Sequence, residues 1–276
     1  MKRTQLVEKI FEKGTFLCVG LDPDSAKMPP ALAEKGCEGL LEFNKNIIDA
    51  TAQYCVAYKP NLAFYEAFGS KGYEVFEETC AYIRNNYPEH MIIADAKRGD
   101  IGNTARMYAK ALYEGAGVDA VTLAPYMGED SVKPFLSYED KWAIVLALTS
   151  NASATDFEMV SDSKGVPLFE RVIRRSRHWG SPVNMMYVVG ATKAEYFDAV
   201  RAVAPRHFLL VPGVGAQGGS LEDVCRHGMI DECGLLVNSS RGIIHASQGD
   251  DYAEAAAEAA RVMAEQMTVL LAEYAK

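Results

Sequence analysis

Short apolar runs recur along the whole chain, and each of them ends abruptly in polar residues or glycine. Stretches whose apolar residues recur at helical spacing separate these runs. Strands that alternate with helices form parallel sheets, because two parallel strands need a long crossover between them. The pattern therefore predicts an α/β fold with eight strands, at residues 16–21, 55–58, 91–94, 120–123, 143–148, 185–189, 208–211 and 235–237.

The strand count and the chain length favour a closed barrel. A (β/α)8 barrel takes about 250 residues, and this chain has 276. The alternative is an open, doubly wound sheet, in which strands and helices alternate in the same way. We predict one (β/α)8 barrel (TIM barrel) domain over residues 1–276. A short helix near residues 6–11 would cap the bottom of the barrel, and a long helix at 252–274 would close the chain.

Composition excludes several classes of function. The formal net charge of −9 argues against a nucleic-acid partner, which would need a basic surface. Six cysteines are scattered without a C-x-x-C pair, so we expect reduced thiols, no disulfide framework and no zinc site. No apolar stretch reaches the ~18 residues of a membrane span. We therefore expect a cytoplasmic protein without a membrane partner.

The segment from Asp95 to Asp100, D-A-K-R-G-D, closes the third predicted strand. Regular strand alternation would place Asp95 and Lys97 on the same face. Gly99 then allows the chain to turn into the next helix. Two carboxylates and an ammonium thus gather where a strand becomes a helix, which is where α/β folds hold their chemistry. A structural ion pair, with Asp100 as the helix N-cap, would account for the same residues.

Polar residues also follow the other predicted strands. Taken singly, each has a structural interpretation as a turn residue, an exposed charge or a cap. A barrel would bring all of them to one rim, and this convergence predicts an active site there. The residues are Asp22, Lys59, Ser150, Gly213, Ser239 and Arg241.

The loop after the seventh strand predicts a phosphate site. It carries four glycines within residues 213–219, and glycine lets backbone N–H groups approach an anion closely. Arg241 follows the eighth strand, and a guanidinium binds phosphate in a bidentate manner. A merely flexible loop would explain the glycines but not the arginine. Metal-ligand clusters, dinucleotide fingerprints and nucleophile elbows do not occur in the sequence, so lysine and aspartate are left to carry a cofactor-free reaction.

The segment D-A-K-R-G-D-I-G-N-T at residues 95–104 resembles the signature of the orotidine 5′-phosphate decarboxylases, in their bacterial-type branch with D-A-K-R-G-D-I-G-x-T. Segments 20–24, 59–61, 123–128 and 212–215 resemble the family's other motifs in the same order. The resemblance runs from about residue 16 to about residue 245. D-x-K-x-x-D alone is shared with sugar-phosphate lyases of the same superfamily, whereas the whole set is specific.

The resemblance implies decarboxylation of orotidine 5′-phosphate to UMP and CO2, the last step of de novo pyrimidine nucleotide synthesis, without metal or cofactor. It implies that Lys97 protonates the carbon from which CO2 departs. Lys59, Asp95 and Asp100 would complete an alternating array of lysine and aspartate. The family is also homodimeric, and Asp100 and Thr104 would be donated to the neighbouring subunit's site.

The resemblance also implies how the substrate is bound. Asp22 would bind ribose hydroxyls, Ser150 the pyrimidine amide, and Gln217 with Arg241 the 5′-phosphate. The full set of expected substrate-binding residues is Asp22, Thr104, Ser150, Pro212, Gly213, Gln217, Gly218, Ser240 and Arg241.

Three other functions remain open at this point. A keto-sugar-phosphate decarboxylase or hexulose-phosphate synthase on the same scaffold would require magnesium. An aldolase would form a Schiff base on Lys97. A nucleotide-phosphate sensor would bind UMP without releasing CO2, although binding alone has no use for crowded carboxylates.

Overall fold

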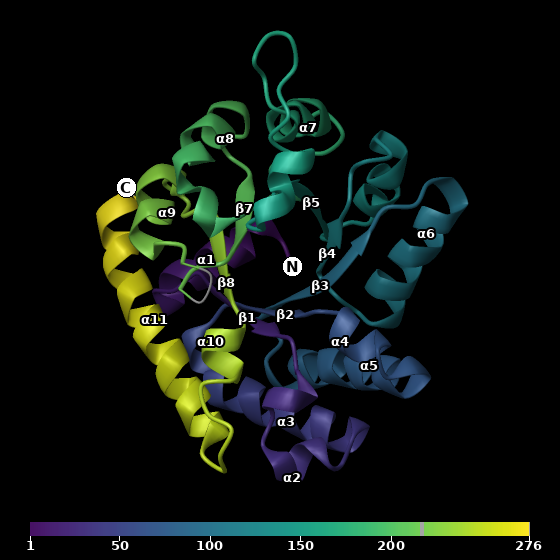
Figure 1. Ribbon diagram of the computed structural model, residues 1–276, viewed down its shortest axis with the longest axis vertical. Coiled ribbons are helices and arrows are strands. Elements are labelled where there is room, and N and C mark those ends of the chain that lie inside the picture. Colours follow the sequence, from purple (N-terminus) through teal and green to yellow (C-terminus); the bar gives the residue numbers. More distant parts are fainter. Residues whose placement is uncertain (216–217, 276) are drawn as a thin grey trace.

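A computed structural model describes residues 1–215 and 218–275, and its central feature is a closed barrel of eight parallel strands (Figure 1). The strands follow the chain order around the barrel, and β8 pairs with β1 to close it. The predicted (β/α)8 barrel is therefore confirmed. The strands are β1 (Leu17–Leu21), β2 (Ala57–Pro60), β3 (Met91–Arg98), β4 (Ala120–Leu123), β5 (Trp142–Leu148), β6 (Met185–Val189), β7 (Phe208–Pro212) and β8 (Leu235–Ser239).

Helices surround this barrel (Figure 1). They lie in the connections between strands, except for α1, which precedes β1, and α10 and α11, which follow β8. The α-helices are α1 (Arg3–Lys13), α2 (Pro30–Ala33), α3 (Cys37–Thr51), α4 (Ala63–Glu66), α5 (Gly69–Asn86), α6 (Gly102–Lys110), α7 (Leu168–Ser176), α8 (Phe197–Val203), α9 (Leu221–Gly228), α10 (Arg241–Ile244) and α11 (Tyr252–Tyr274).

Two helical stretches of the sequence are each divided in the structure. The first consists of α6 followed by a π-helical turn, η3 (Ala111–Gly115). The second begins as a 3-10 segment, η7 (Ala191–Tyr196), before α8. Apolar periodicity reports which face is buried and does not distinguish these hydrogen-bond registers, so the sequence could not separate them.

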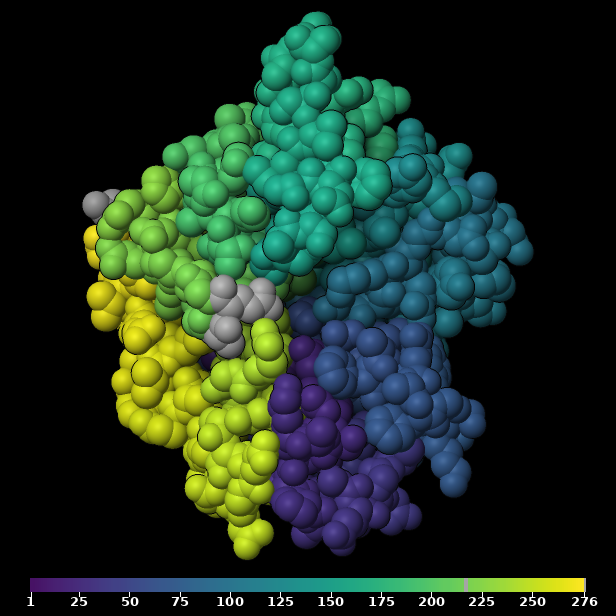
Figure 2. Space-filling view, viewed as in Figure 1, coloured from purple at the N-terminus to yellow at the C-terminus, as the bar shows by residue number. Residues whose placement is uncertain are grey.

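The strands are apolar because both of their faces are covered. Every residue of β1, β4, β6 and β8 is buried, between the packed barrel interior and the outer helices. The partly exposed residues of β3 and β7 lie at the carboxyl ends of these strands. Figure 2 shows this carboxyl-end face, which is hollowed near its centre between segments drawn in green and in blue.

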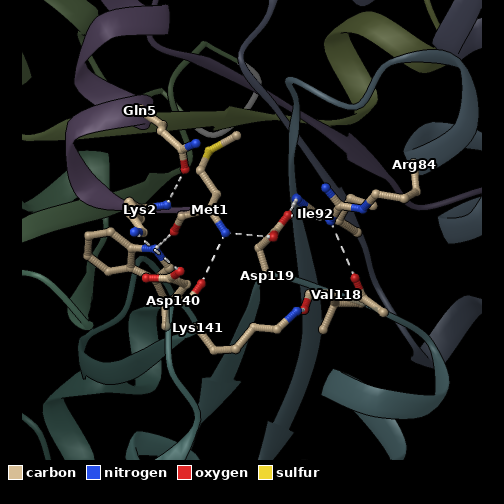
Figure 3. A network of polar contacts seen from close by, with 11 residues as sticks. Met1, Lys2, Gln5, Arg84, Ile92, Val118, Asp119, Asp140 and Lys141 are labelled. Carbon is tan, nitrogen blue, oxygen red and sulfur yellow. Dashed lines mark hydrogen bonds and ion pairs between the residues drawn. The ribbon is translucent and has the colours of Figure 1, made fainter.

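Helix α1 closes the opposite end, as predicted. The Met1 ammonium lies 3.0 Å from Oδ1 of Asp119, just before β4 (Figure 3). Trp142 at the start of β5 donates a hydrogen bond from Nε1 to the Met1 carbonyl. The Arg3 guanidinium stacks 4.9 Å from the ring centroid of Phe208, at the start of β7. Because this end is covered, ligands have access to the barrel from its carboxyl end.

Two further features of the described residues concern the chain's environment. All six cysteines are free, and five of them are buried while Cys37 is partly exposed. Within residues 1–215 and 218–275, no helix combines the length and the apolar character that crossing a bilayer requires.

Candidate active site

A carboxylate held between two lysines forms the centre of the site. Asp95, on β3, accepts a hydrogen bond of 2.9 Å at Oδ2 from Nζ of Lys59 and one of 2.7 Å at Oδ1 from Nζ of Lys97. Lys59 lies on the neighbouring strand β2 and is buried, whereas half of the Lys97 side chain is exposed. The barrel thus fixes one lysine in its wall and leaves the other free to face a ligand.

The three charges support one another. Burial by itself would raise the pKa of Asp95, but Lys59 and Lys97 outweigh it and hold the pKa well below its usual range. Burial would lower the pKa of Lys59, but Asp95 and Asp22 outweigh it and raise the pKa. Asp95 and Lys59 are therefore both charged at neutral pH.

A bulge in β3 brings Asp95 and Lys97 together. Ala94 pairs with Val121 and Arg98 with Leu123, so the three residues between them on β3 face the single residue Thr122 on β4. Lys97 itself has a left-handed backbone, with φ of 45°. The two side chains meet as predicted, but regular strand alternation is not the reason, because the strand is irregular between them.

Two cavities open at this rim, and they share Lys59, Asp95 and Pro212. The first, which we call the polar cavity, has a volume of about 180 Å³ and is lined by Asp22, Lys59, Asp95, Pro212, Gly213, Val214, Asn238, Ser239, Ser240 and Arg241. The second, the apolar cavity, has a volume of about 240 Å³ and is lined by Lys59, Asp95, Lys97, Thr122, Leu146, Thr149, Ser150, Asn151, Val188, Leu210 and Pro212.

The polar cavity contains buried acceptors that lack partners among the described residues. Oδ1 of Asp22 and Oδ1 of Asn238 are both in this state. A buried acceptor without a donor is costly, so these atoms are suited to ligand hydroxyl or N–H groups. Sequence reasoning missed Asn238, although an asparagine directly after the apolar residues of β8 was an available signal.

The glycine loop after β7 forms another part of the polar cavity. Gly213 has φ of 98° and Gly218 has φ of 88°, a region that disfavours residues with a side chain. The exposed Arg241 begins α10 and lines the same cavity as Gly213 and Ser240. Gly218 lines neither cavity, and Gln217 lies outside the described residues.

The end of β5 places Ser150 at the apolar cavity. Its carbonyl accepts a hydrogen bond of 3.1 Å from the Thr192 hydroxyl. Gly190 lies so close that a Cβ there would be 2.7 Å from the Ser150 backbone. Thr149, which precedes Ser150, donates hydrogen bonds from its amide and its hydroxyl to the Glu158 carboxylate. These contacts tie the loop after β5 to the barrel.

Two expected site residues lie apart from this centre within one chain. Asp100 and Thr104 line neither cavity. Oδ1 of Asp100 accepts a hydrogen bond of 2.7 Å from the amide of Ile101. The N-cap of α6 is Ile101, so the interpretation of Asp100 as N-cap is wrong. Thr104 is exposed on α6.

Comparisons with known proteins show the family to which the chain belongs. The model of the "Orotidine 5'-phosphate decarboxylase / HUMPS family" matches residues 15–259. An orotidine 5′-phosphate decarboxylase of Phocaeicola vulgatus is 55% identical over 273 residues, which cover 99% of this chain and 100% of that protein. One of Parabacteroides distasonis is 58% identical over 267 residues, covering 97% and 95%. The structure of Leishmania donovani OMP decarboxylase is similar, with a TM-score of 0.83 and 34% identity, covering 98% and 99%.

Proposed function

We propose that Lys97 is the catalytic acid of this chain, which belongs to the orotidine 5′-phosphate decarboxylase / HUMPS family. The chain is a carboxy-lyase that converts orotidine 5′-phosphate to UMP and CO2. This reaction is the last step of pyrimidine nucleotide synthesis. The observation that carries the proposal is the short contact between Lys97 and the largely buried Asp95 at the mouth of a cavity.

The chemistry needs a fixed positive charge. When the bond to the carboxyl group breaks, its electron pair stays on ring carbon six of the pyrimidine and CO2 leaves. An ammonium held beside that carbon stabilises the carbanion and then transfers a proton to it from Nζ. Asp95 holds the Lys97 ammonium in place, and Lys59 balances the carboxylate from the other side.

The two cavities suit the two ends of the substrate. We place the 5′-phosphate in the polar cavity, at Pro212, Gly213, Ser240 and Arg241, with Gly218 and Gln217 of the same loop as further candidates. The unpartnered Oδ1 of Asp22 would accept a ribose hydroxyl. The pyrimidine would occupy the apolar cavity, with its amide at Ser150. Phosphate binding far from the reacting carbon would then help to orient the ring.

A homodimer would supply the remaining groups. Asp100 and Thr104 lie outside this chain's own cavities, in a region with exposed apolar side chains. Ile101 is 44% exposed and Met107 is 53% exposed, both at α6, and Tyr126 after β4 is 92% exposed. A second copy that covered these side chains would remove their apolar surface from water. A second copy docked there would receive Asp100 and Thr104 in its site.

The role of Lys97 is tested by a direct assay. Lys97→Ala is expected to abolish the loss of orotidine monophosphate absorbance while leaving the circular dichroism spectrum unchanged. Near-normal turnover would refute the assignment of the acid. A strict magnesium requirement would instead favour a metal-dependent lyase of the same scaffold, and borohydride trapping with substrate would indicate a Schiff base.

The shared site is tested by mixing two inactive proteins. In a hybrid dimer of Lys97→Ala and Asp100→Ala, one site is intact, so a random mixture should regain about a quarter of wild-type activity. The matched control mixes Lys97→Ala with Asp95→Asn. Both residues belong to the same chain's half of the site, so that mixture should stay inactive. Continued inactivity of the first mixture, despite proven hybrid formation, would reject the shared site.

We also propose that residues 1–276 act as a single domain in the cytoplasm. The buried apolar residues form one continuous core that includes residues from α1 to α11. The six free cysteines suit a reducing compartment.

A further inference from the structure

We propose that Thr122 is a positioning residue for decarboxylation, which sets the place of Lys97 through two hydrogen bonds of one hydroxyl. The inference rests on the proposed role of Lys97. Neither the sequence motifs nor the comparisons single out Thr122. It lies on β4, next to the bulge of β3, and is buried with 1% exposure.

The hydroxyl of Thr122 contacts both the backbone of Lys97 and the carboxylate that holds its ammonium. Oγ1 accepts a hydrogen bond of 3.0 Å from the backbone amide of Lys97. It also donates a hydrogen bond of 2.9 Å to Oδ1 of Asp95. The same Oδ1 accepts Nζ of Lys97 at 2.7 Å. Oγ1 of Thr122 therefore contacts Lys97 directly at its backbone amide and, through Oδ1 of Asp95, indirectly at its Nζ.

The bulge explains why a hydroxyl is needed at this position. Three residues of β3 face Thr122 alone, so the backbone of β4 does not offer one carbonyl to each amide of the bulge. The Thr122 side chain supplies an acceptor for the Lys97 amide instead. This bond holds Lys97 in a left-handed conformation that residues with a Cβ rarely adopt. Without it, the backbone of Lys97 would be free to relax toward a more favourable conformation.

The direction of the hydroxyl proton fixes Asp95 as well. A threonine hydroxyl has one proton, and because Oγ1 accepts from the Lys97 amide, that proton is available to Asp95. Oδ1 of Asp95 is thereby turned toward Thr122 and Lys97, while Oδ2 faces Lys59. A small displacement of an acid from its target carbon lowers the rate strongly, whereas substrate affinity depends on other contacts.

The test compares a substitution that keeps the shape of Thr122 with one that keeps its hydroxyl. Thr122→Val removes both hydrogen bonds and keeps the shape of the side chain, whereas Thr122→Ser keeps the hydroxyl. We expect Thr122→Val to lower kcat roughly 10- to 100-fold, with KM and the Kd of UMP within about threefold of wild type. Thr122→Ser should restore kcat to within about threefold of wild type.

A threonine at the other end of the barrel provides a matched control. The Thr15 hydroxyl, just before β1, is also fully buried, accepts the Leu17 amide at 3.2 Å and donates to Sδ of Met267 at 3.4 Å. Thr15→Val should lower the melting temperature and leave kcat unchanged. If Thr122→Val does not fold, Thr122→Ala removes the same two bonds and gives the same readout.

Three results would overturn the inference. They are an unchanged kcat in Thr122→Val, a serine variant as impaired as the valine variant, and a KM that rises as much as kcat falls. The proposed function fails separately, through an active Lys97→Ala variant. An inactive Lys97→Ala variant together with a fully active Thr122→Val variant would reject the role of Thr122 alone.

Discussion

Nζ of Lys59 lies 2.9 Å from Oδ2 of Asp95, and both side chains are almost completely withdrawn from water, with 5% and 11% exposure. Removing one partner of a buried ion pair leaves an uncompensated charge, at a cost of about 3–5 kcal/mol. We therefore expect Asp95→Asn to lower the free energy of unfolding by about this amount.

The double variant Lys59→Met/Asp95→Asn should be more stable than Asp95→Asn, because it buries no unpaired lysine. Both variants should be inactive. Urea denaturation together with the decarboxylation assay separates these effects. A double variant that is less stable than the single one would contradict this expectation, because it would show that Lys59 still stabilises the barrel after Asp95 is replaced.

Gly20 on β1 keeps the polar cavity open. A Cβ at this position would lie 1.8 Å from Oγ of Ser240 and 3.2 Å from Oδ1 of Asn238. Gly20→Ala should therefore displace Ser240 and raise both KM and the Kd of UMP about tenfold, with a stability loss of about 1–3 kcal/mol. Isothermal titration with UMP measures the affinity. Gly115→Ala is the control, since outside its own helical turn the nearest described atom to a Cβ there would be Oε1 of Glu77, 3.9 Å away, and this variant should bind UMP normally.

Asp119 is a buried acceptor at the base of the barrel. It is 3% exposed and accepts the Met1 ammonium at 3.0 Å, Arg84 at 2.7 Å and the Ile92 amide at 2.9 Å (Figure 3). Asp119→Asn removes the charge that these donors need, and should cost about 2–4 kcal/mol of stability without changing kcat.

The comparison for Asp119 is the same substitution at a neighbouring residue. Asp140 is 56% exposed and lies 3.8 Å from Lys2, so Asp140→Asn should stay within about 0.5 kcal/mol of wild type. Urea denaturation measures both variants. Equal midpoints for the two variants would contradict the importance of the buried carboxylate.

His207 makes stability depend on pH. Burial, together with the charges of Arg3, Arg201 and Arg177, lowers its pKa from 6.5 to about 4. Between these values the unfolded chain binds a proton that the folded chain does not, so stability is fully present above pH 6.5 and falls as the pH drops toward 4. The shift corresponds to a loss of at most ~3 kcal/mol at pH 4.

His207→Phe should flatten this dependence. Both ring nitrogens of His207 lack a partner among the described residues, so the phenyl ring leaves no donor or acceptor unpaired. Melting temperatures from pH 7 to pH 4 would show a smaller decline than in wild type. His178→Phe alters an exposed histidine and should decline as wild type does. A parallel decline in His207→Phe would mean that other groups control the acid response.

The sequence alone determined the architecture and the rim on which the charges gather. Eight apolar runs that alternate with helices leave few architectures open, and parallel strands place all of their carboxyl ends on one rim. Lys59, Asp95 and Arg241 could therefore be assigned to one site from their positions after the predicted strands, before any contact was known. The family motifs then added the reaction.

Only the tertiary structure decided how that rim is built. Strand periodicity cannot reveal a bulge, because the extra residues depend on the register between β3 and β4, which residues far apart in the chain set together. The two hydrogen bonds of the Thr122 hydroxyl and the unpartnered Oδ1 of Asn238 follow from that packing. Asp100 is close to Asp95 and Lys97 in sequence, yet it lines neither of the two cavities. Local sequence thus fixed which groups reach the rim, and long-range packing fixed which of them touch.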